Sequence, residues 1–272
     1  MFDVEPAGCH SGYLTEIDDE RQHFDDLWGR LGRDLPQDAA DTFAPIITPA
    51  HLPGGAPGGL QHLKAYEILV AQGVDGKVVL DYACGLGQWA IRFAQLGATA
   101  RGFDLSPVGI ELARERVRRS GEGLAVEFEV ASAESLPYED ESFDLVAGIG
   151  ALHHVIKYPG TADELWRVMR PGATAVFTEN LGHNPLIQLA RRWTMRGNDA
   201  GDVILTVPTV EAWAHRFSSV DVWGSSLLTM AKRVIPTHRS TLGALHRVDE
   251  LLFKAAPALR KYGGESVITL VK

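Results

Sequence analysis

Two acidic residues stand at the ends of neighbouring apolar runs, at a spacing that suits the recognition of a nucleoside. Asp81 follows the run 78–80 and precedes a glycine turn, and Asp104 closes the next apolar run. A carboxylate placed like that of Asp104 can accept hydrogen bonds from both hydroxyls of a ribose. In the turn, Gly85 and Gly87 let a ligand approach the backbone, and the amides of a following helix attract negative charge. The pattern predicts a site for a nucleoside-containing cofactor.

The glycine turn by itself fits more than one adenosine cofactor. Residues 85–90 satisfy the G-x-G-x-x-G/A pattern of dinucleotide binding, so NAD stays an alternative at this point. Asp81 lies four residues before Gly85, where a carboxylate would repel a pyrophosphate and attract a cationic ligand. S-Adenosylmethionine carries an ammonium and a sulfonium. The position of Asp81 therefore favours this cofactor over NAD.

The elements that must position these residues form a repeating pattern from residue 76 onward. Short β-rich runs alternate with amphipathic stretches, as in a parallel sheet covered by helices. We expect strands at Lys77–Asp81, Thr99–Asp104, Ala125–Val130, Phe143–Ile149 and Ala173–Glu179. We expect helices at Gln88–Leu96, Pro107–Arg119 and Thr161–Met169, with Ser106 as the cap before Pro107.

The end of the chain and three segments outside the repeat complete the predicted architecture. A helix over Val210–Phe217 precedes two late strands, Val220–Trp223 and Ser266–Val271, which we expect to pair in antiparallel fashion. The fold class is therefore α/β: a Rossmann-like, doubly wound, mostly parallel seven-stranded sheet with a late antiparallel strand and a helical lid. Additions to such sheets gather over the carboxyl edge, where ligands bind. The segments outside the repeat are residues 1–60, 181–208 and 224–264.

Four motifs in register make residues 75–180 resemble the class I S-adenosylmethionine-dependent methyltransferases. Residues 79–87 are similar to the first motif of that family, with Ala83 in place of its usual first glycine. Residues 131–138 resemble its adenine-contacting segment, with Ser132 at a position where Asp is common. The resemblance implies S-adenosylmethionine as the cofactor and a Rossmann-like sheet as the fold.

The two remaining motifs point to one group within this family. The segment Leu152-His153-His154 and the turn at residues 165–172 are similar to a broad group that contains ubiquinone/menaquinone C-methyltransferases and many small-molecule methyltransferases. The resemblance implies methyl transfer to a carbon or oxygen of a small-molecule acceptor of natural-product, quinone or isoprenoid type. The implied division is an N-terminal lid or extension over residues 1–60 and a methyltransferase domain over 61–272, with acceptor-site insertions at about 181–208 and 224–264.

The resemblance also assigns nine residues to the cofactor. Asp81 would lie near the methionine ammonium, and Asp104 would hold the ribose hydroxyls. Leu105 would pack on the adenine, Ser132 would meet its polar edge, and the backbone at Gly150 would close the methionine end. The full expected set is Asp81, Ala83, Gly85, Gly87, Asp104, Leu105, Ser132, Ala133 and Gly150.

A base at the carboxyl edge of the sheet is the expected catalytic group. Methyl transfer from a sulfonium is an in-line displacement, so the protein must hold the acceptor and, where needed, remove a proton. Glu179 ends the fifth predicted strand, and His153 and His183 map to the same edge. We take these three as the catalytic candidates, and His154 is as suited to a structural hydrogen bond as to catalysis. Carboxylates are absent from residues 147–153, so no metal site is predicted.

Aromatic and basic residues of the insertions offer two hypotheses about the acceptor. Trp193, Trp213 and Trp223 could form an aromatic wall, with burial in the core as the plainer role. The basic residues could recognise an anionic acceptor, such as a carboxylate or a phosphorylated isoprenoid, with a solvated helix face as the alternative. They are Arg191, Arg192 and Arg196 in one group and Lys232, Arg233, His238 and Arg239 in the other.

Composition excludes several classes of protein. The 272 residues include 26 Lys and Arg against 35 Asp and Glu, a net charge of -9 that disfavours nucleic acid as a partner. No window approaches the roughly 18 apolar residues of a membrane span, and the acidic N-terminus lacks the basic start of a secretory signal, so we expect a cytoplasmic protein. Cys9 and Cys84 support neither a disulfide framework nor structural zinc.

Two further functions remain as alternatives to a methyltransferase, and the oligomeric state stays open. One is a nicotinamide-dependent oxidoreductase, which the glycine turn permits but which no dehydrogenase substrate motif supports. The other is a catalytically silent protein that binds S-adenosylmethionine, because Asp81 and Asp104 indicate binding and not turnover.

Overall fold

A single mixed sheet forms the centre of the computed structural model. The structure describes residues 9–31, 46–49, 51–52, 55, 59–120, 123–185, 188, 203–233 and 237–272, with side chains from residue 16 on. The strands are β1 (Val78–Tyr82), β2 (Thr99–Asp104), β3 (Val126–Val130), β4 (Phe143–Ile149), β5 (Met169–Asn180), β6 (Ser219–Ser225) and β7 (Glu265–Val271).

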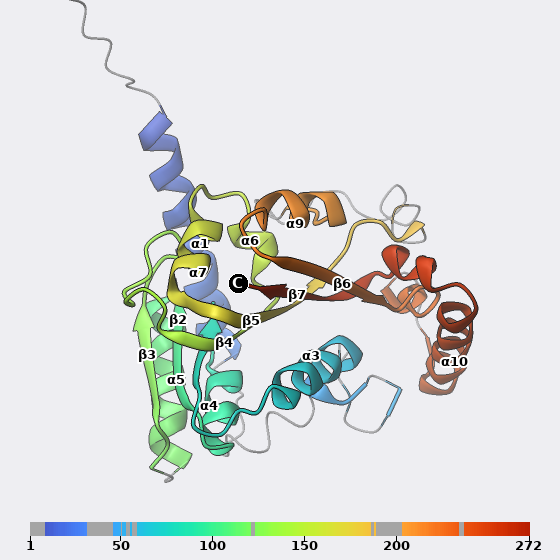
Figure 1. Cartoon of the computed structure of the whole chain (residues 1–272), viewed down its shortest axis with the longest axis horizontal. Coiled ribbons are helices and arrows are strands. Elements are labelled where there is room, and N and C mark those ends of the chain that lie inside the picture. The colour runs from blue at the N-terminus through green and yellow to red at the C-terminus, as the bar shows by residue number, and fades with distance from the viewer. Residues whose placement is uncertain are drawn as a thin grey trace, which may run out of the picture.

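The order of the strands confirms the predicted fold class. They run β3-β2-β1-β4-β5-β7-β6, with β7 antiparallel to both of its neighbours and the pairs from β3 to β5 parallel. The order reverses between β1 and β4, and Figure 1 shows the sheet crossing the middle of the molecule. Such a reversal opens a crevice at the carboxyl ends of the strands, which is where ligands bind in doubly wound sheets.

Helices cover both faces of this sheet. They are α1 (Cys9–Leu31), α3 (Gly59–Ala71), α4 (Gln88–Gln95), α5 (Pro107–Ser120), α6 (Leu152–Val155), α7 (Thr161–Val168), α9 (Val207–Trp213) and α10 (Arg239–Ala255). Residues of α6, α7 and α9 pack with Phe177 and Ile268, whereas α3 and α4 pack with Val176 on the opposite face (Figure 1). Within the described ranges, no helix combines the length and the apolar character that crossing a membrane requires.

Side-chain caps determine where two of the helices begin. Ser106 caps α5 as expected, because its Oγ accepts a hydrogen bond from Gly109 N at 3.0 Å. The predicted helix at Val210–Phe217 begins earlier, at Val207, because Thr206 Oγ1 accepts a hydrogen bond from Thr209 N at 3.3 Å and a proline follows in the first turn.

Two connections within the sheet also differ from the simple repeat. β5 begins at Met169 instead of the predicted Ala173, because Met169 pairs with Phe143 before a shift in register. Residues 131–142, which join β3 to β4, are all described and form turns and an isolated bridge instead of a helix.

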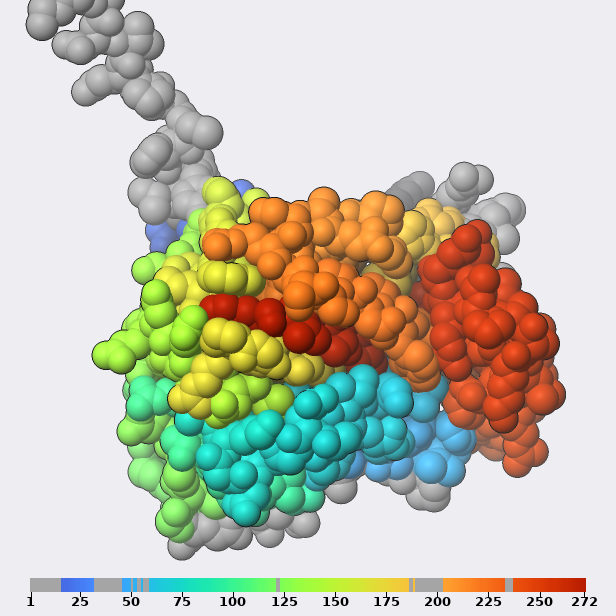
Figure 2. All heavy atoms as spheres, in the orientation of Figure 1, coloured from blue at the N-terminus to red at the C-terminus, as the bar shows by residue number. Residues whose placement is uncertain are grey.

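The insertion over residues 224–264 lies beyond the carboxyl edge of β6. It contains the 3-10 helices η2 (Thr229–Arg233) and η3 (Pro257–Tyr262) on either side of α10. The buried Asp249 of α10 accepts hydrogen bonds from the amides of Leu228 and Thr229 at 2.7 and 3.0 Å, which holds η2 against the helix. In Figure 2 this insertion forms the end of the molecule farthest from β3.

Candidate functional site

A cavity of about 240 Å³ lies at the carboxyl ends of β1, β2 and β4. This volume lies somewhat below the range for small-molecule sites, roughly 300–1,000 Å³. The glycine turn after β1, the residues after β2 and the start of the β3–β4 connection form its walls, and α1 forms a further wall. The cavity therefore coincides with the predicted nucleoside site.

Asp104 anchors the glycine turn from the end of β2. Its Oδ2 accepts a hydrogen bond from Gly85 N at 2.8 Å, and its Oδ1 accepts one from Ser106 N at 3.0 Å. The side chain is buried and lines the cavity, and burial raises the pKa of its carboxyl above the usual range. A carboxylate has about four acceptor positions, so Asp104 can bind these amides and ribose hydroxyls together.

Asp81 provides a second buried carboxylate in the same wall. Its Oδ2 accepts a hydrogen bond from Ala90 N at 2.9 Å, in the first turn of α4. Burial raises the pKa of Asp81 to about 8, the Ala90 amide opposes this effect, and the nearby Asp104 adds to it. A cation in the cavity would stabilise the ionised form of Asp81 and lower this pKa.

The three predicted turn residues all have left-handed backbone conformations, and they play different parts. Ala83 (φ 53°) and Gly85 (φ 51°) line the cavity, and a Cβ atom on Gly85 would lie 2.8 Å from Cζ2 of Trp28. Gly87 (φ 70°) does not line the cavity, and a Cβ there would lie 2.4 Å from Cζ of Phe128. Its role in the structure is therefore the close packing of α4 on β3.

The remaining predicted cofactor residues lie at two ends of the cavity. Leu105, Ser132 and Ala133 line the end beside β2 and β3, where the adenine was expected. Ser132 Oγ also accepts a long hydrogen bond of 3.4 Å from Glu134 N. Gly150 lines the end beside β4, and its N donates a hydrogen bond to Thr178 O at 2.9 Å.

One face of α1 closes over the cavity. Ile17, Glu20, Phe24 and Trp28 all line it, at a spacing that brings them to one side of a helix. The rings of Phe24 and Trp28 stack with centroids 6.1 Å apart, and Phe24 meets the ring of His154 edge-on. The described part of the predicted N-terminal lid therefore contributes directly to the site.

Polar contacts fasten α1 to both sides of the cavity. Glu20 accepts a hydrogen bond from Tyr158 Oη at 2.5 Å and lies 3.3 Å from His154 Nδ1. Asp25 accepts hydrogen bonds from Ser106 Oγ and from the Val108 amide, at the start of α5. These contacts hold the helix across the crevice.

The charges around the cavity suit a cation that carries a ribose. Among the described lining residues, Glu20, Asp81 and Asp104 are acidic, and none is Lys or Arg. A dinucleotide pyrophosphate would meet carboxylates without a compensating cation. The buried Nε1–H of Trp28 has no hydrogen-bond partner among the described residues and lies on the α5 side of the ring, beside Gly109. The residues present therefore fit S-adenosylmethionine.

Two of the three catalytic candidates contact each other beside this cavity. Glu179 is 1% exposed, and its two oxygens lie 2.6 Å from Leu152 N and 2.8 Å from His153 Nδ1. The His153 side chain is 24% exposed, and its Cε1 lies 3.7 Å from the position of a Cβ on Gly150. Neither residue lines the cavity itself, so His153 stands behind the methionine end and Glu179 behind His153.

His183 and His154 differ from the roles that the sequence suggested. His183 Nε2 accepts a hydrogen bond from Val207 N at 3.2 Å, which places this imidazole at the start of α9 and outside the cavity wall. His154, which could not be ranked from the sequence, lines the cavity and contacts α1 through Glu20. The structure thus brings His153 and Glu179 together and leaves His183 elsewhere.

Of the three tryptophans predicted to form an aromatic wall for the acceptor, Trp213 and Trp223 do not line the cavity. Trp213 donates from Nε1 to Thr161 Oγ1 at 3.0 Å, and Trp223 packs against the guanidinium of Arg260, both away from the cavity. Trp193 lies outside the described residues. Aromatic residues that do line the cavity are Phe24, Trp28, Trp89, Phe103 and Tyr158.

The described basic residues of the second group have partners in the protein. Lys232 Nζ lies 2.6 Å from Oε1 of the buried Glu265. His238 Nδ1 accepts from Ser240 N at 3.4 Å as the cap of α10, and Arg239 donates to Leu52 O at 3.0 Å. The side chain of Arg233 and all of Arg191, Arg192 and Arg196 lie outside the described residues.

Several residues of the site carried no functional signal in the sequence. Glu20, Phe24 and Trp28 belong to the segment that was predicted only as a lid, although their helical spacing is readable from residue 17 onward. Tyr158 follows the double histidine in the sequence, and its hydroxyl donates a hydrogen bond to Glu20 of α1. A search for apolar and aromatic residues at helical spacing before the glycine turn would have found Phe24 and Trp28 but not Glu20.

Comparison with known proteins identifies similar domains. Residues 80–177 match a family model described as a methyltransferase domain. Methyltransferase GfsG of Streptomyces halstedii is 41% identical over 98 residues, which cover 36% of this chain and 35% of GfsG. The probable phthiotriol/phenolphthiotriol dimycocerosates methyltransferase 2 of Mycobacterium ulcerans (strain Agy99) is 35% identical over 121 residues, which cover 43% of this chain and 45% of that protein. The matched part is less than half of either relative.

Solved structures share the fold over a larger part of the chain. The PH0226 protein from Pyrococcus horikoshii OT3 superposes with a TM-score of 0.55 at 18% identity, over 80% of this chain and 92% of that one. The [4+2]-cyclase SpnF gives a TM-score of 0.52 at 20% identity, over 77% of this chain and 80% of that one. At these identities the likeness describes the fold alone.

Proposed function

We propose that this chain, which contains a class I S-adenosylmethionine-dependent methyltransferase domain, transfers a methyl group to a hydroxyl oxygen or an acidic carbon of a small, largely apolar acceptor. The cofactor of such a domain is S-adenosylmethionine. The relatives named above are methyltransferases by their names, and the name of one gives phthiotriol/phenolphthiotriol dimycocerosates as its substrates. The matched segment carries the motifs of the cofactor half of the domain, so the acceptor must be argued from the site.

The observation that carries the proposal is the pairing of two buried carboxylates in a cavity without lysine or arginine among its described lining residues. Bound S-adenosylmethionine would supply an electrophilic methyl carbon on a sulfonium. Asp81 is suited to the cationic methionine end and Asp104 to the ribose hydroxyls, and the Asp104–Gly85 contact of 2.8 Å keeps the glycine turn against them. NAD would bring a pyrophosphate to the same carboxylates.

His153 and Glu179 supply the proton chemistry in this proposal. The Glu179 carboxylate binds the Nδ1–H of His153 at 2.8 Å, which leaves Nε2 as the basic nitrogen. An acceptor held near Gly150 could transfer its proton to Nε2 as its oxygen or carbon attacks the methyl carbon. Glu179 would then stabilise the imidazolium without receiving the proton itself. We therefore assign His153 as the base and Glu179 as the positioning residue, and we give His183 no catalytic part.

The proposed acceptor is neutral and apolar because of what lines the cavity. Ile17, Ile46 and Ile149 contribute aliphatic surface to the cavity wall. The described basic residues that could have bound an anion instead contact Glu265, Ser240 and Leu52. An anionic acceptor, such as a carboxylate or an isoprenoid phosphate, is the alternative that remains with Arg191, Arg192 and Arg196.

Two measurements test this function. Calorimetry with S-adenosylmethionine and with NAD should show binding of the former, and binding of NAD alone would support the oxidoreductase alternative. Incubation with a panel of neutral phenols and hydroxylated lipids, beside prenyl diphosphates and carboxylic acids, should release S-adenosylhomocysteine with the neutral compounds. Turnover with the anionic compounds alone would overturn the neutral acceptor, and binding without any turnover would favour the catalytically silent protein.

A further inference from the structure

The connection between β3 and β4 forms the adenine end of the cavity without any helical support of its own. Its first residues, Ala131, Ser132 and Ala133, line the cavity. A local turn follows, in which Ser135 N donates to Ser132 O at 3.1 Å. Contacts with neighbouring segments therefore help to fix the shape of this wall.

The start of the connection is tied to the cofactor site, and its middle is tied to α7. Upstream, Ala131 N donates to Asp104 O at 3.0 Å. Downstream, Leu136 N donates to Glu164 Oε2 at 2.9 Å, and Leu136 O accepts from Arg167 Nη2 at 3.1 Å. Both backbone groups of a residue that is 5% exposed are thus bound by side chains of one helix.

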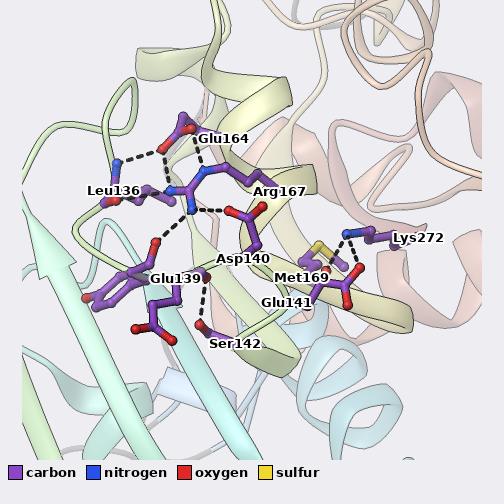
Figure 3. A network of polar contacts seen from close by, with 10 residues as sticks. Leu136, Glu139, Asp140, Glu141, Ser142, Glu164, Arg167, Met169 and Lys272 are labelled. Carbon is purple, nitrogen blue, oxygen red and sulfur yellow. Dashed lines mark hydrogen bonds and ion pairs between the residues drawn. The ribbon is translucent and has the colours of Figure 1, made fainter.

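Arg167 and Glu164 form a rigid clamp around this position (Figure 3). The guanidinium binds the Glu164 carboxylate through two parallel contacts of 2.8 Å, from Nε and from Nη2. Its Nη1 donates to Tyr138 O at 2.7 Å and to Asp140 at 2.8 Å. Contact with Arg167 lowers the pKa of Glu164, so the carboxylate stays ionised.

We propose that Arg167 and Glu164 are positioning residues for the cofactor, which act through the β3–β4 connection to hold the Ser132–Ala133 wall in place. This inference rests on the proposed function, because it assumes that adenine occupies that end of the cavity. Removal of the clamp leaves the buried Leu136 amide and carbonyl without their partners, and the connection shifts to recover hydrogen bonds. Cofactor affinity falls in consequence, whereas the His153–Glu179 pair on the other side of the site keeps its geometry.

A neighbouring arginine provides a matched control. Arg170 pairs with Asp144 at 2.6 Å and donates to Glu141 O at 3.0 Å, so it makes a comparable set of contacts. Asp144 also accepts a hydrogen bond from Val78 N, at the start of β1 and therefore at the edge of the sheet opposite the cavity. Arg170→Met removes an ion pair of the same type, and its one contact with the connection, at Glu141 O, lies at the β4 end and not at Leu136 or the Ser132–Ala133 wall.

The test compares Arg167→Met, Arg167→Lys and Glu164→Gln with Arg170→Met in the full chain. For Arg167→Met we expect the dissociation constant for S-adenosylhomocysteine and the KM for S-adenosylmethionine to rise by about tenfold, with kcat within about twofold. Arg167→Lys keeps the positive charge but cannot make the two parallel contacts of the guanidinium. Its dissociation constant and KM should therefore lie between those of the wild type and of Arg167→Met. Arg170→Met should leave both constants near those of the wild type.

An analogue of S-adenosylhomocysteine distinguishes a displaced adenine wall from a general loss of stability. S-Inosylhomocysteine carries a carbonyl in place of the adenine amino group, and the wild-type protein should prefer the adenine compound. The preference should shrink in Arg167→Met and persist in Arg170→Met. If Arg167→Met does not fold, Arg167→Lys and Glu164→Gln answer the same question by the same readouts.

The possible outcomes separate this inference from the proposed function. A wild-type protein that binds no S-adenosylhomocysteine overturns the proposed function and the inference with it. A wild-type protein that binds, together with clamp variants of unchanged affinity and preference, overturns the inference alone. An equal loss of affinity in Arg170→Met also overturns it, because the effect would then be one of stability.

Discussion

The carboxylate of Glu179 lies 2.8 Å from Nδ1 of His153 and 2.6 Å from the amide of the preceding residue, Leu152. One buried side chain therefore sets both the start of α6 and the orientation of the first imidazole on it. The strand that ends at Asn180 fixes Glu179, because its neighbours pair with β4 and β7 on both sides. The position of His153 is thus determined by the centre of the sheet.

This arrangement predicts how turnover depends on the pair. His153→Gln removes the base, so we expect turnover to fall by roughly 10²–10⁴ with cofactor affinity within about twofold of wild type. Glu179→Gln cannot balance the imidazolium and should also lower turnover, while the double variant should be no worse than His153→Gln alone. Steady-state rates and calorimetry on the three variants provide the measurement. Additive losses would show that the two residues act separately.

Asp104 should combine a role in cofactor binding with a role in stability. Asp104→Ala removes the acceptor for ribose and for the Gly85 and Ser106 amides, so we expect a loss of about 1.5–3 kcal/mol in cofactor binding, or ten- to a hundredfold. The melting temperature without cofactor should fall as well. Asp144→Asn, which alters a carboxylate at the opposite edge of the sheet, serves as the control. Wild-type affinity in a folded Asp104→Ala protein would contradict the assignment of the ribose site.

Cofactor binding should strengthen as the pH rises toward 8. Burial and the nearby Asp104 raise the pKa of Asp81 to about 8 in the cofactor-free protein, so at neutral pH most molecules hold a proton on this carboxyl. A sulfonium and an ammonium favour the ionised form, so binding should release about one proton below that pH and none well above it. Calorimetry in buffers of different ionisation enthalpy measures this number. Asp81→Asn should abolish the release, and a release that persists in this variant would assign it to another group.

The ring of Trp28 should slow the departure of the cofactor. It lies against the glycine turn and lines the cavity, so Trp28→Ala should raise the dissociation rate of S-adenosylhomocysteine by about tenfold and change the association rate less. Trp28→Phe, which keeps an aromatic ring, should recover part of the effect. Stopped-flow displacement gives both rates. Equal rates for Trp28→Ala and wild type would mean that α1 does not retain the ligand.

The fold and the residues expected around the cofactor could be predicted from the sequence, because both predictions depend on local patterns. Strand periodicity, the turn at residues 85–87 and the acid at Asp104 are short-range features. The motifs of the family resemblance are equally local, and eight of the nine residues that they assigned to the cofactor line the cavity. The exception, Gly87, shows the limit of such patterns. Its missing side chain makes room for Phe128 of β3, a contact between segments that no local motif encodes.

The remaining parts of the site depend on tertiary contacts. The burial of Glu179 behind His153 follows from strand pairing, and a residue at the end of a strand can face either the ligand or the interior. The part played by α1 depends on how a segment before the sheet folds back on it. The periodicity of residues 17–28 predicts a helix with an apolar face, but which surface that face covers is decided by distant residues such as Tyr158 and Ser106.

The short helix α6 connects α1, which closes over the cavity, to the proposed base His153. His153 contacts Glu179 on the sheet side, while the adjoining His154 contacts Glu20 of α1, and the two imidazoles lie 3.9 Å apart. A movement of α1 would therefore displace α6, which carries both imidazoles. The proposed base is held from the sheet, while its neighbour holds the helix that covers the cavity. A substitution at Glu20 would therefore reach the cavity wall through His154 without removing the contact that orients His153.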